Sequence, residues 1–173
     1  QQSAGASRGL VTLIHGWEGS SDSTYVLSMG NYLYDKGYDV FRLNLRDHGE
    51  SHHLNEGLFH GALIKETFQA ARNIAGLSDN KPFYLVGFSL GANFALRIAV
   101  GHSQSAISNL KQVIAVSPAL DPYKATVSID GSLAIYRYYF LNKWKNSLRI
   151  KQHLFPDKYD FRDIMHHKTC MAL

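Results

Sequence analysis

The sequence predicts an α/β fold in which helices cover a mostly parallel sheet. Short apolar runs, rich in β-branched residues, alternate along the chain with longer amphipathic runs. Strands that alternate with helices need crossover connections, and these connections place neighbouring strands in parallel. The composition agrees, because 173 residues with 45% hydrophobic and 18% charged side chains are typical of one globular domain.

The predicted elements follow one another in a regular order. Strands are expected at 10–15, 38–45, 83–87 and 113–117, and helices at 25–35, 60–75 and 89–100. The strands are predicted from apolar runs such as LVTLI, FYLVG and VIAVS, and from the alternation of apolar and polar residues in YDVFRLNL. In the first two helices apolar residues recur every three or four positions, and Gly37 and Gly76 stand where these helices would end.

The character of the chain changes after Pro118. Residues 132–152 are rich in Tyr, Leu, Lys and Arg without a strand pattern. We therefore expect a core over residues 1–122 and a mostly helical cap or tail over residues 123–173. Charge divides in the same place: residues 124–173 hold 9 Lys and Arg against 4 Asp and Glu, whereas the first 123 residues hold 9 against 10. We interpret the basic residues, which are spread out, as a solvated helical face.

The segment from Gly87 to Gly91 carries the main chemical signal. It fits the pattern G-x-S-x-G, lies directly after the strand FYLVG and directly precedes a nearly uniformly apolar helix. Strand, sharp turn and helix form the context of a nucleophile elbow, in which flanking glycines let the serine occupy a strained turn. Ser89 is the predicted nucleophile. The alternative is a glycine-flanked loop in which Ser89 is an ordinary helix N-cap.

A second signal follows the first strand, where His15 and Gly16 precede Trp17. In hydrolases with a nucleophile elbow, this loop supplies one backbone N–H of the oxyanion hole, and the residue after the nucleophile supplies the other. The predicted donors are therefore the N–H groups of Trp17 and Leu90. His15 is expected to hold the loop by hydrogen bonds rather than to act as the catalytic base.

The segments LIHGWEGSSDSTY, FRLNLRDHGES and LVGFSLGANFAL resemble the α/β-hydrolase fold family, and most closely the YheT-like group of bacterial hydrolases. The resemblance covers residues 10–100. It implies acyl ester hydrolysis with a Ser–Asp–His triad and leaves the substrate open. Arg46 to Ser51 is similar to the R-G-H-G-x-S loop of many serine hydrolases. Asp47 stands where that loop usually has Gly, a departure that concerns the loop's structure more than the chemistry.

The same resemblance implies two further strands that carry the triad acid and base, and no such pattern follows residue 117. We therefore expect a truncated chain whose acid and base lie outside it. Asp121, after the fourth strand, and His167, in the tail, are the weaker candidates within the chain, with His166 as an equivalent of His167. Turn formation before Pro122 is the alternative for Asp121.

Other ligands find little support in the sequence. Four histidines lie close in sequence: His48, His52, His53 and His60. No Cys or paired carboxylates join them at metal-ligand spacing. The sequence therefore predicts neither a metal nor a cofactor. No nucleic-acid motif is found. No apolar run reaches the ~18 residues of a membrane-spanning helix. The only cysteine, Cys170, excludes an intrachain disulfide, which agrees with the cytoplasmic location that we predict.

The sequence thus predicts a serine hydrolase that cleaves small-molecule carboxylic esters through an acyl-serine. Two alternatives stay open. An acyltransferase or a thioesterase would use the same serine with another acceptor or substrate. A binding protein on a hydrolase fold would have lost the nucleophile or the elbow glycines, and this chain keeps all three residues. The oligomeric state is not predicted.

Overall fold

The computed structural model describes residues 7–172, which form two compact units. Within the described residues, the first unit comprises residues 7–45 and His60–Ala119, and the second comprises Arg46–Phe59 and residues 120–172. A loop after the second strand thus belongs with the C-terminal third of the chain. The core at 1–122 and the cap at 123–173 stay a prediction of domain organisation.

The first unit is built around a four-stranded parallel sheet. Its elements are β1 (Leu10–Ile14), α1 (Thr24–Asp35), β2 (Asp39–Leu43), α2 (Ile64–Gly76), β3 (Phe83–Phe88), α3 (Leu90–Gln104) and β4 (Leu110–Val116). The strand order is β2-β1-β3-β4, and every pair is parallel. Because β1 and β3 are central and adjacent, with Ile14 opposite Gly87, the loops that follow them begin side by side.

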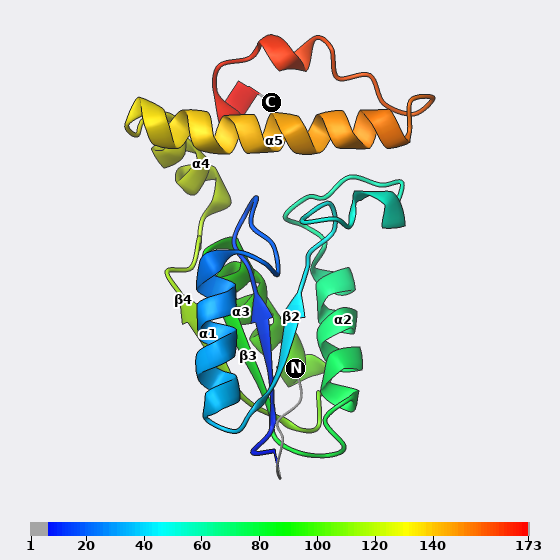
Figure 1. Cartoon of the computed structure of the whole chain (residues 1–173), viewed down its shortest axis with the longest axis vertical. Coiled ribbons are helices and arrows are strands. Elements are labelled where there is room, and N and C mark those ends of the chain that lie inside the picture. The colour runs from blue at the N-terminus through cyan, green and yellow to red at the C-terminus, as the bar shows by residue number, and fades with distance from the viewer. Residues whose placement is uncertain (1–6, 173) are drawn as a thin grey trace. The chain divides into compact units, whose positions relative to one another are not determined.

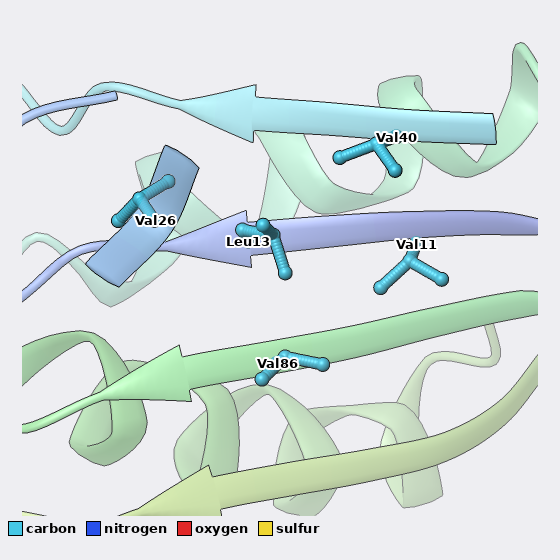
Figure 2. Packing of buried hydrophobic residues seen from close by; sticks show 5 residues of the cluster. All are labelled: Val11, Leu13, Val26, Val40 and Val86. Atoms are coloured by element: carbon cyan, nitrogen blue, oxygen red, sulfur yellow. The ribbon is translucent and has the colours of Figure 1, made fainter. Parts of the chain in front are cut away.

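Helices cover both faces of this sheet (Figure 1). On one face, α1 packs on β1 and β2. Figure 2 shows the resulting cluster, in which Val26 of α1 meets side chains from β1, β2 and β3. Its buried members are Val11, Leu13, Val26, Val40 and Val86. The alternate residues of β1 and β3, among them Ile14 and Leu85, are equally buried, as strands covered on both faces require.

The second unit is mainly helical. Its elements are the 3₁₀ turn η1 (His52–Leu54), the helices α4 (Pro122–Asp130) and α5 (Ala134–Leu154), and the 3₁₀ turns η2 (Ile164–His166) and η3 (Cys170–Ala172). η1 and η3 both contact α5, and η3 also contacts α4. No described helix has the length and apolar character needed to cross a membrane.

The fold class predicted from the sequence is confirmed: a mostly parallel sheet with flanking helices, followed by helices alone. Three element boundaries were wrong by three residues or more. The third helix ends at Gln104 rather than residue 100. The second helix begins at Ile64 rather than residue 60, because residues 61–63 form a turn. The fourth strand begins at Leu110 rather than residue 113, because at this sheet edge the polar Lys111 and Gln112 stay exposed.

Candidate active site

Ser89 occupies a strained turn between β3 and α3. Its φ of 51° and ψ of −112° lie outside the regions that ordinary residues favour. Ser89 is exposed, and its side chain makes no capping hydrogen bond to α3. An ordinary N-cap has an extended backbone and its oxygen accepts an N–H of the first turn, so the N-cap alternative does not describe this residue.

The two glycines of the motif are required by close backbone approach. A Cβ built on Gly87 would lie 2.6 Å from the amide nitrogen of Ala92 and would collide with the carbonyl of Gly91. A Cβ on Gly91 would collide with the carbonyl oxygens of His15 and Ile14 and lie 2.8 Å from the carbonyl carbon of Ile14. Because these neighbours are backbone atoms that cannot rotate away, the start of α3 can lie against the end of β1 only with glycine here.

The loop after β1 lies directly beside Ser89. A Cβ built on Gly16 would be 3.2 Å from the Cβ of Ser89 and 3.4 Å from the carbonyl oxygen of Phe88. Trp17 is the next residue, so its N–H belongs to the peptide that joins it to Gly16. The sequence-predicted loop and elbow are therefore neighbours within the first unit.

His15 fixes the orientation of that peptide. The ring is fully buried; Leu45 donates its N–H to Nε2 over 3.1 Å, so Nδ1 carries the proton and donates to the Gly16 carbonyl over 2.7 Å. In a trans peptide the carbonyl and the following N–H point in opposite directions, and no described peptide is cis. Holding the Gly16 carbonyl therefore also fixes the direction of the Trp17 N–H. Burial lowers the pKa of His15, which favours the neutral ring that this arrangement needs.

The Leu90 N–H is fixed by the same principle. The Ser89 carbonyl, which shares its peptide, accepts the N–H groups of Asn93 at 3.1 Å and Ala119 at 3.2 Å. Ser89 in turn donates its N–H to the Val116 carbonyl over 3.0 Å, and the Asn93 side chain donates to the Ala119 carbonyl over 2.9 Å. The last residue of β4 and the segment that follows it thus fix the backbone of the elbow by hydrogen bonds. Asn93 lay within the motif used for the family resemblance, yet its spacing did not predict this role.

Asp121 and His167 belong to the second unit. The Asp121 carboxylate caps α4, accepting the Lys124 N–H over 3.0 Å, and lies 3.7 Å from the Lys124 ammonium group. This agrees with the turn-forming alternative. His167 is exposed, and its backbone carbonyl accepts a hydrogen bond from Lys145. No hydrogen bond joins the Asp121 and His167 side chains in the described part of the chain.

The second unit is held by a buried ion pair that the sequence did not reveal. The Lys151 ammonium group lies 2.7 Å from the Asp47 carboxylate, and both side chains are almost wholly buried. Lys151 also donates to the carbonyls of His52 and Asn55. Asp47 has a φ of 56°, a left-handed conformation that explains why related loops place Gly at this position. As expected, the departure concerns the loop's structure.

The neighbouring histidines have structural contacts. His52 is hydrogen-bonded through Nε2 to the Ser147 hydroxyl at 2.8 Å, and His48 through Nδ1 to the Arg46 carbonyl at 2.7 Å. Burial lowers the pKa of His52, with the Asp47 charge opposing this effect and the Lys151 charge adding to it. Within residues 7–172, no group of three His, Cys, Asp or Glu side chains could hold a metal ion.

The chain belongs to the α/β hydrolase fold family, whose model matches residues 9–157. It is similar to a monoacylglycerol lipase of Saccharomyces cerevisiae, with 24% identity over 160 residues, which are 90% of this chain and 35% of that protein. The chain thus spans about a third of the length of that relative.

Two solved structures share the fold. The monoacylglycerol lipase of Paleococcus ferrophilus has a TM-score of 0.55 and 24% identity, over 70% of this chain and 43% of that one. A thermostable carboxyl esterase of Bacillus coagulans has a TM-score of 0.52 and 17% identity, over 65% of this chain and 36% of that one. These likenesses establish the architecture on which the candidate site is built.

Proposed function

We propose that the chain carries the nucleophile and the oxyanion hole of a serine hydrolase that cleaves carboxylic esters. The observation that supports this most directly is the strained, exposed Ser89, placed beside the loop of Gly16 and Trp17. Strain in a turn that no capping interaction requires is characteristic of a catalytic position. Membership of the α/β hydrolase fold family agrees with hydrolysis in general.

In the proposed reaction the Ser89 oxygen attacks the ester carbonyl carbon while a base takes the hydroxyl proton. The carbonyl oxygen becomes an oxyanion and accepts the N–H groups of Trp17 and Leu90. Collapse of this intermediate breaks the bond to the alcohol, which leaves with the proton from the base. Water then attacks the acyl-serine in the same manner and releases the carboxylic acid. The two amides need little rearrangement, because their peptides are already held.

The acid and the base of the proposed triad are not assigned to residues of this chain. We propose that both lie outside these residues, as in hydrolases in which later strands carry them. Asp121 with His167 is the pair to test if the chain proves sufficient. The capping role of Asp121 weighs against it, because a carboxylate that orients a histidine must be free to accept its N–H.

Esters of a fatty acid and glycerol are the substrates to test first, since two of the similar proteins are named monoacylglycerol lipases. The closer similarity to the YheT-like group, the cytoplasmic location and the lack of a nucleic-acid partner stay predictions from sequence. Transfer of the acyl group to an alcohol or a thiol in place of water would reveal an acyltransferase, and hydrolysis of a thioester substrate would reveal a thioesterase.

A fluorophosphonate probe tests the nucleophile. In a longer protein that also carries the proposed acid and base, the probe should label Ser89, and Ser89→Ala should abolish both labelling and hydrolysis of p-nitrophenyl acetate. Ser117→Ala is a matched control, because Ser117 is also exposed and also has a positive φ, of 47°. It should leave labelling unchanged. Labelling that survives Ser89→Ala would refute the proposal.

The same assay addresses the triad. Without a base, the oxyanion hole and binding alone leave roughly 10³–10⁴-fold acceleration over water. Residues 1–173 should therefore hydrolyse the ester far more slowly than an ordinary esterase. Rapid, Ser89-dependent turnover would instead place the acid and base within these residues, and substitution of Asp121 and His167 would identify them.

A further inference from the structure

Tyr25, the second residue of α1, contacts both sides of the candidate oxyanion hole. Its hydroxyl oxygen accepts the Gly16 N–H over 2.9 Å. Its ring lies edge-on against Phe88, the residue before the nucleophile, with ring centroids 5.0 Å apart. One side chain thus connects the loop after β1 with the end of β3.

Gly16 needs such support because it has no side chain. A side chain there would be crowded, since a Cβ would be 3.2 Å from the Cβ of Ser89 and 3.4 Å from the Phe88 carbonyl oxygen. The same lack of a side chain leaves its backbone freer to rotate than that of any other residue. Rotation about Gly16 would swing the following peptide and with it the Trp17 N–H. The site therefore has a flexible residue at a point where the proposed chemistry needs a fixed one.

Hydrogen bonds hold Gly16 on both sides. Its carbonyl accepts from His15 Nδ1 at 2.7 Å and from the Gly19 N–H at 3.0 Å. Its N–H donates to the Tyr25 hydroxyl, and Gly16 itself is buried. A Cβ on Gly19 would lie 2.8 Å from the same hydroxyl, which shows how closely the loop wraps around it.

We propose that Tyr25 is a positioning residue for the oxyanion hole: its hydroxyl fixes Gly16 and thereby aims the Trp17 N–H. This inference rests on the proposed function, in which that N–H stabilises the oxyanion. The hydroxyl acts through the backbone and need not touch the substrate. Its loss should therefore lower the rate of the chemical step and leave substrate binding unchanged.

Tyr25→Phe removes the hydroxyl and keeps the ring against Phe88. We expect kcat for p-nitrophenyl acetate and the rate of fluorophosphonate labelling to fall about tenfold, less than the 10²–10³ lost with an oxyanion donor itself. KM should stay within about twofold, because interactions made only in the transition state affect kcat. Hydrogen exchange of the Gly16 amide should become faster, which reports the lost contact directly.

Two controls separate positioning from loss of stability. Tyr32→Phe makes the same change on the same helix at a site that is 58% exposed, and should alter neither rate nor exchange. Val26→Ala removes buried methyl groups beside Tyr25 and should lower the melting temperature without lowering kcat well below that temperature.

The outcomes distinguish this inference from the proposed function. If Ser89 is not labelled in a longer protein that also carries the proposed acid and base, the proposed function fails and the inference with it. If Ser89 is labelled equally fast in the unsubstituted protein and in Tyr25→Phe, the inference alone is overturned. A rise in KM that matches the fall in kcat, or faster Gly16 exchange with normal kcat, also overturns it.

Discussion

The two units of the chain are stabilised in different ways. In the first, apolar side chains of a parallel sheet form the core, and the candidate active-site residues are fixed by backbone contacts between neighbouring strand ends. In the second, few large apolar side chains are buried, and the ion pair between Lys151 and Asp47 is almost wholly buried. We therefore expect the stability of the first unit to depend mainly on steric fit, and that of the second to depend also on the pairing of its buried charges.

The largest effect should come from filling the space at Gly91. Gly91→Ala places a Cβ against the Ile14 and His15 carbonyls, so α3 must move away from β1. Because backbone cannot rearrange locally as a side chain can, we expect a loss of about 3 kcal/mol or more in the free energy of unfolding. Urea denaturation followed by circular dichroism measures it, and Ser89 labelling should decline as the elbow shifts.

Gly76→Ala is the matched control. Gly76 is exposed at the end of α2, and a Cβ there would meet no atom within 4 Å. Alanine favours helix over glycine by about 1 kcal/mol, so this variant should be as stable as the parent or slightly more so. Equal losses for the two variants would contradict the steric argument.

An effect of similar size is expected from Lys151→Met in the second unit. The change leaves the Asp47 carboxylate buried without its partner and removes the donor to the His52 and Asn55 carbonyls. Breaking a buried pair from one side typically costs about 3–5 kcal/mol. Urea denaturation should show this loss, and the double variant Asp47→Asn, Lys151→Met should recover part of it, since no buried charge then remains.

Lys158→Met tests whether burial causes the effect. Lys158 forms an ion pair of the same 2.7 Å length with Glu56, but both side chains are exposed. Water and salt screen such a pair, so the stability of this variant should not differ measurably from that of the parent. A similar loss for Lys151→Met and Lys158→Met would show that burial of the ion pair is not the cause of the effect.

The two regions also differ in how far their structure follows from sequence. The elbow and the loop after β1 could be predicted because local signals specify them: an apolar strand, two glycines and an apolar helix around Ser89. The parallel register then brings Gly16 and Ser89 together with no further information, since Ile14 lies opposite Gly87. Tyr25 gave no such signal, because its contact with Gly16 depends on how α1 packs.

The second unit depends on contacts between residues far apart in the chain. Asp47 and Lys151 are separated by 104 positions, and His52 and Ser147 by 95. A charged residue at such a position usually lies on a solvated surface, so nothing in the sequence distinguishes Lys151 from the other lysines of α5. Asp47 offered a partial signal, because it stands where a related loop has Gly, but its partner could not be inferred.

The smallest expected effect is a pH dependence of the free energy of unfolding. In the first unit this dependence comes from His15. Burial lowers the pKa of His15 in the folded chain, and the neutral ring accepts the Leu45 N–H. The unfolded chain, with a histidine pKa near 6.5, therefore binds more protons in mild acid. Stability is fully present above this value and is lost as the pH falls below it, by at most about 1.4 kcal/mol per pH unit for one histidine.

Replacing His15 should accordingly flatten the dependence of the melting temperature on pH between 7 and 5, whatever the variant's stability at pH 7. His15→Gln tests the first unit. His52→Gln tests the second, where burial also lowers the histidine pKa although the nearby Asp47 charge opposes the shift. His53→Gln, at an exposed neighbouring position, controls for the loss of one histidine. If His15→Gln retains the parent's slope while His52→Gln flattens it, acid sensitivity arises in the second unit alone.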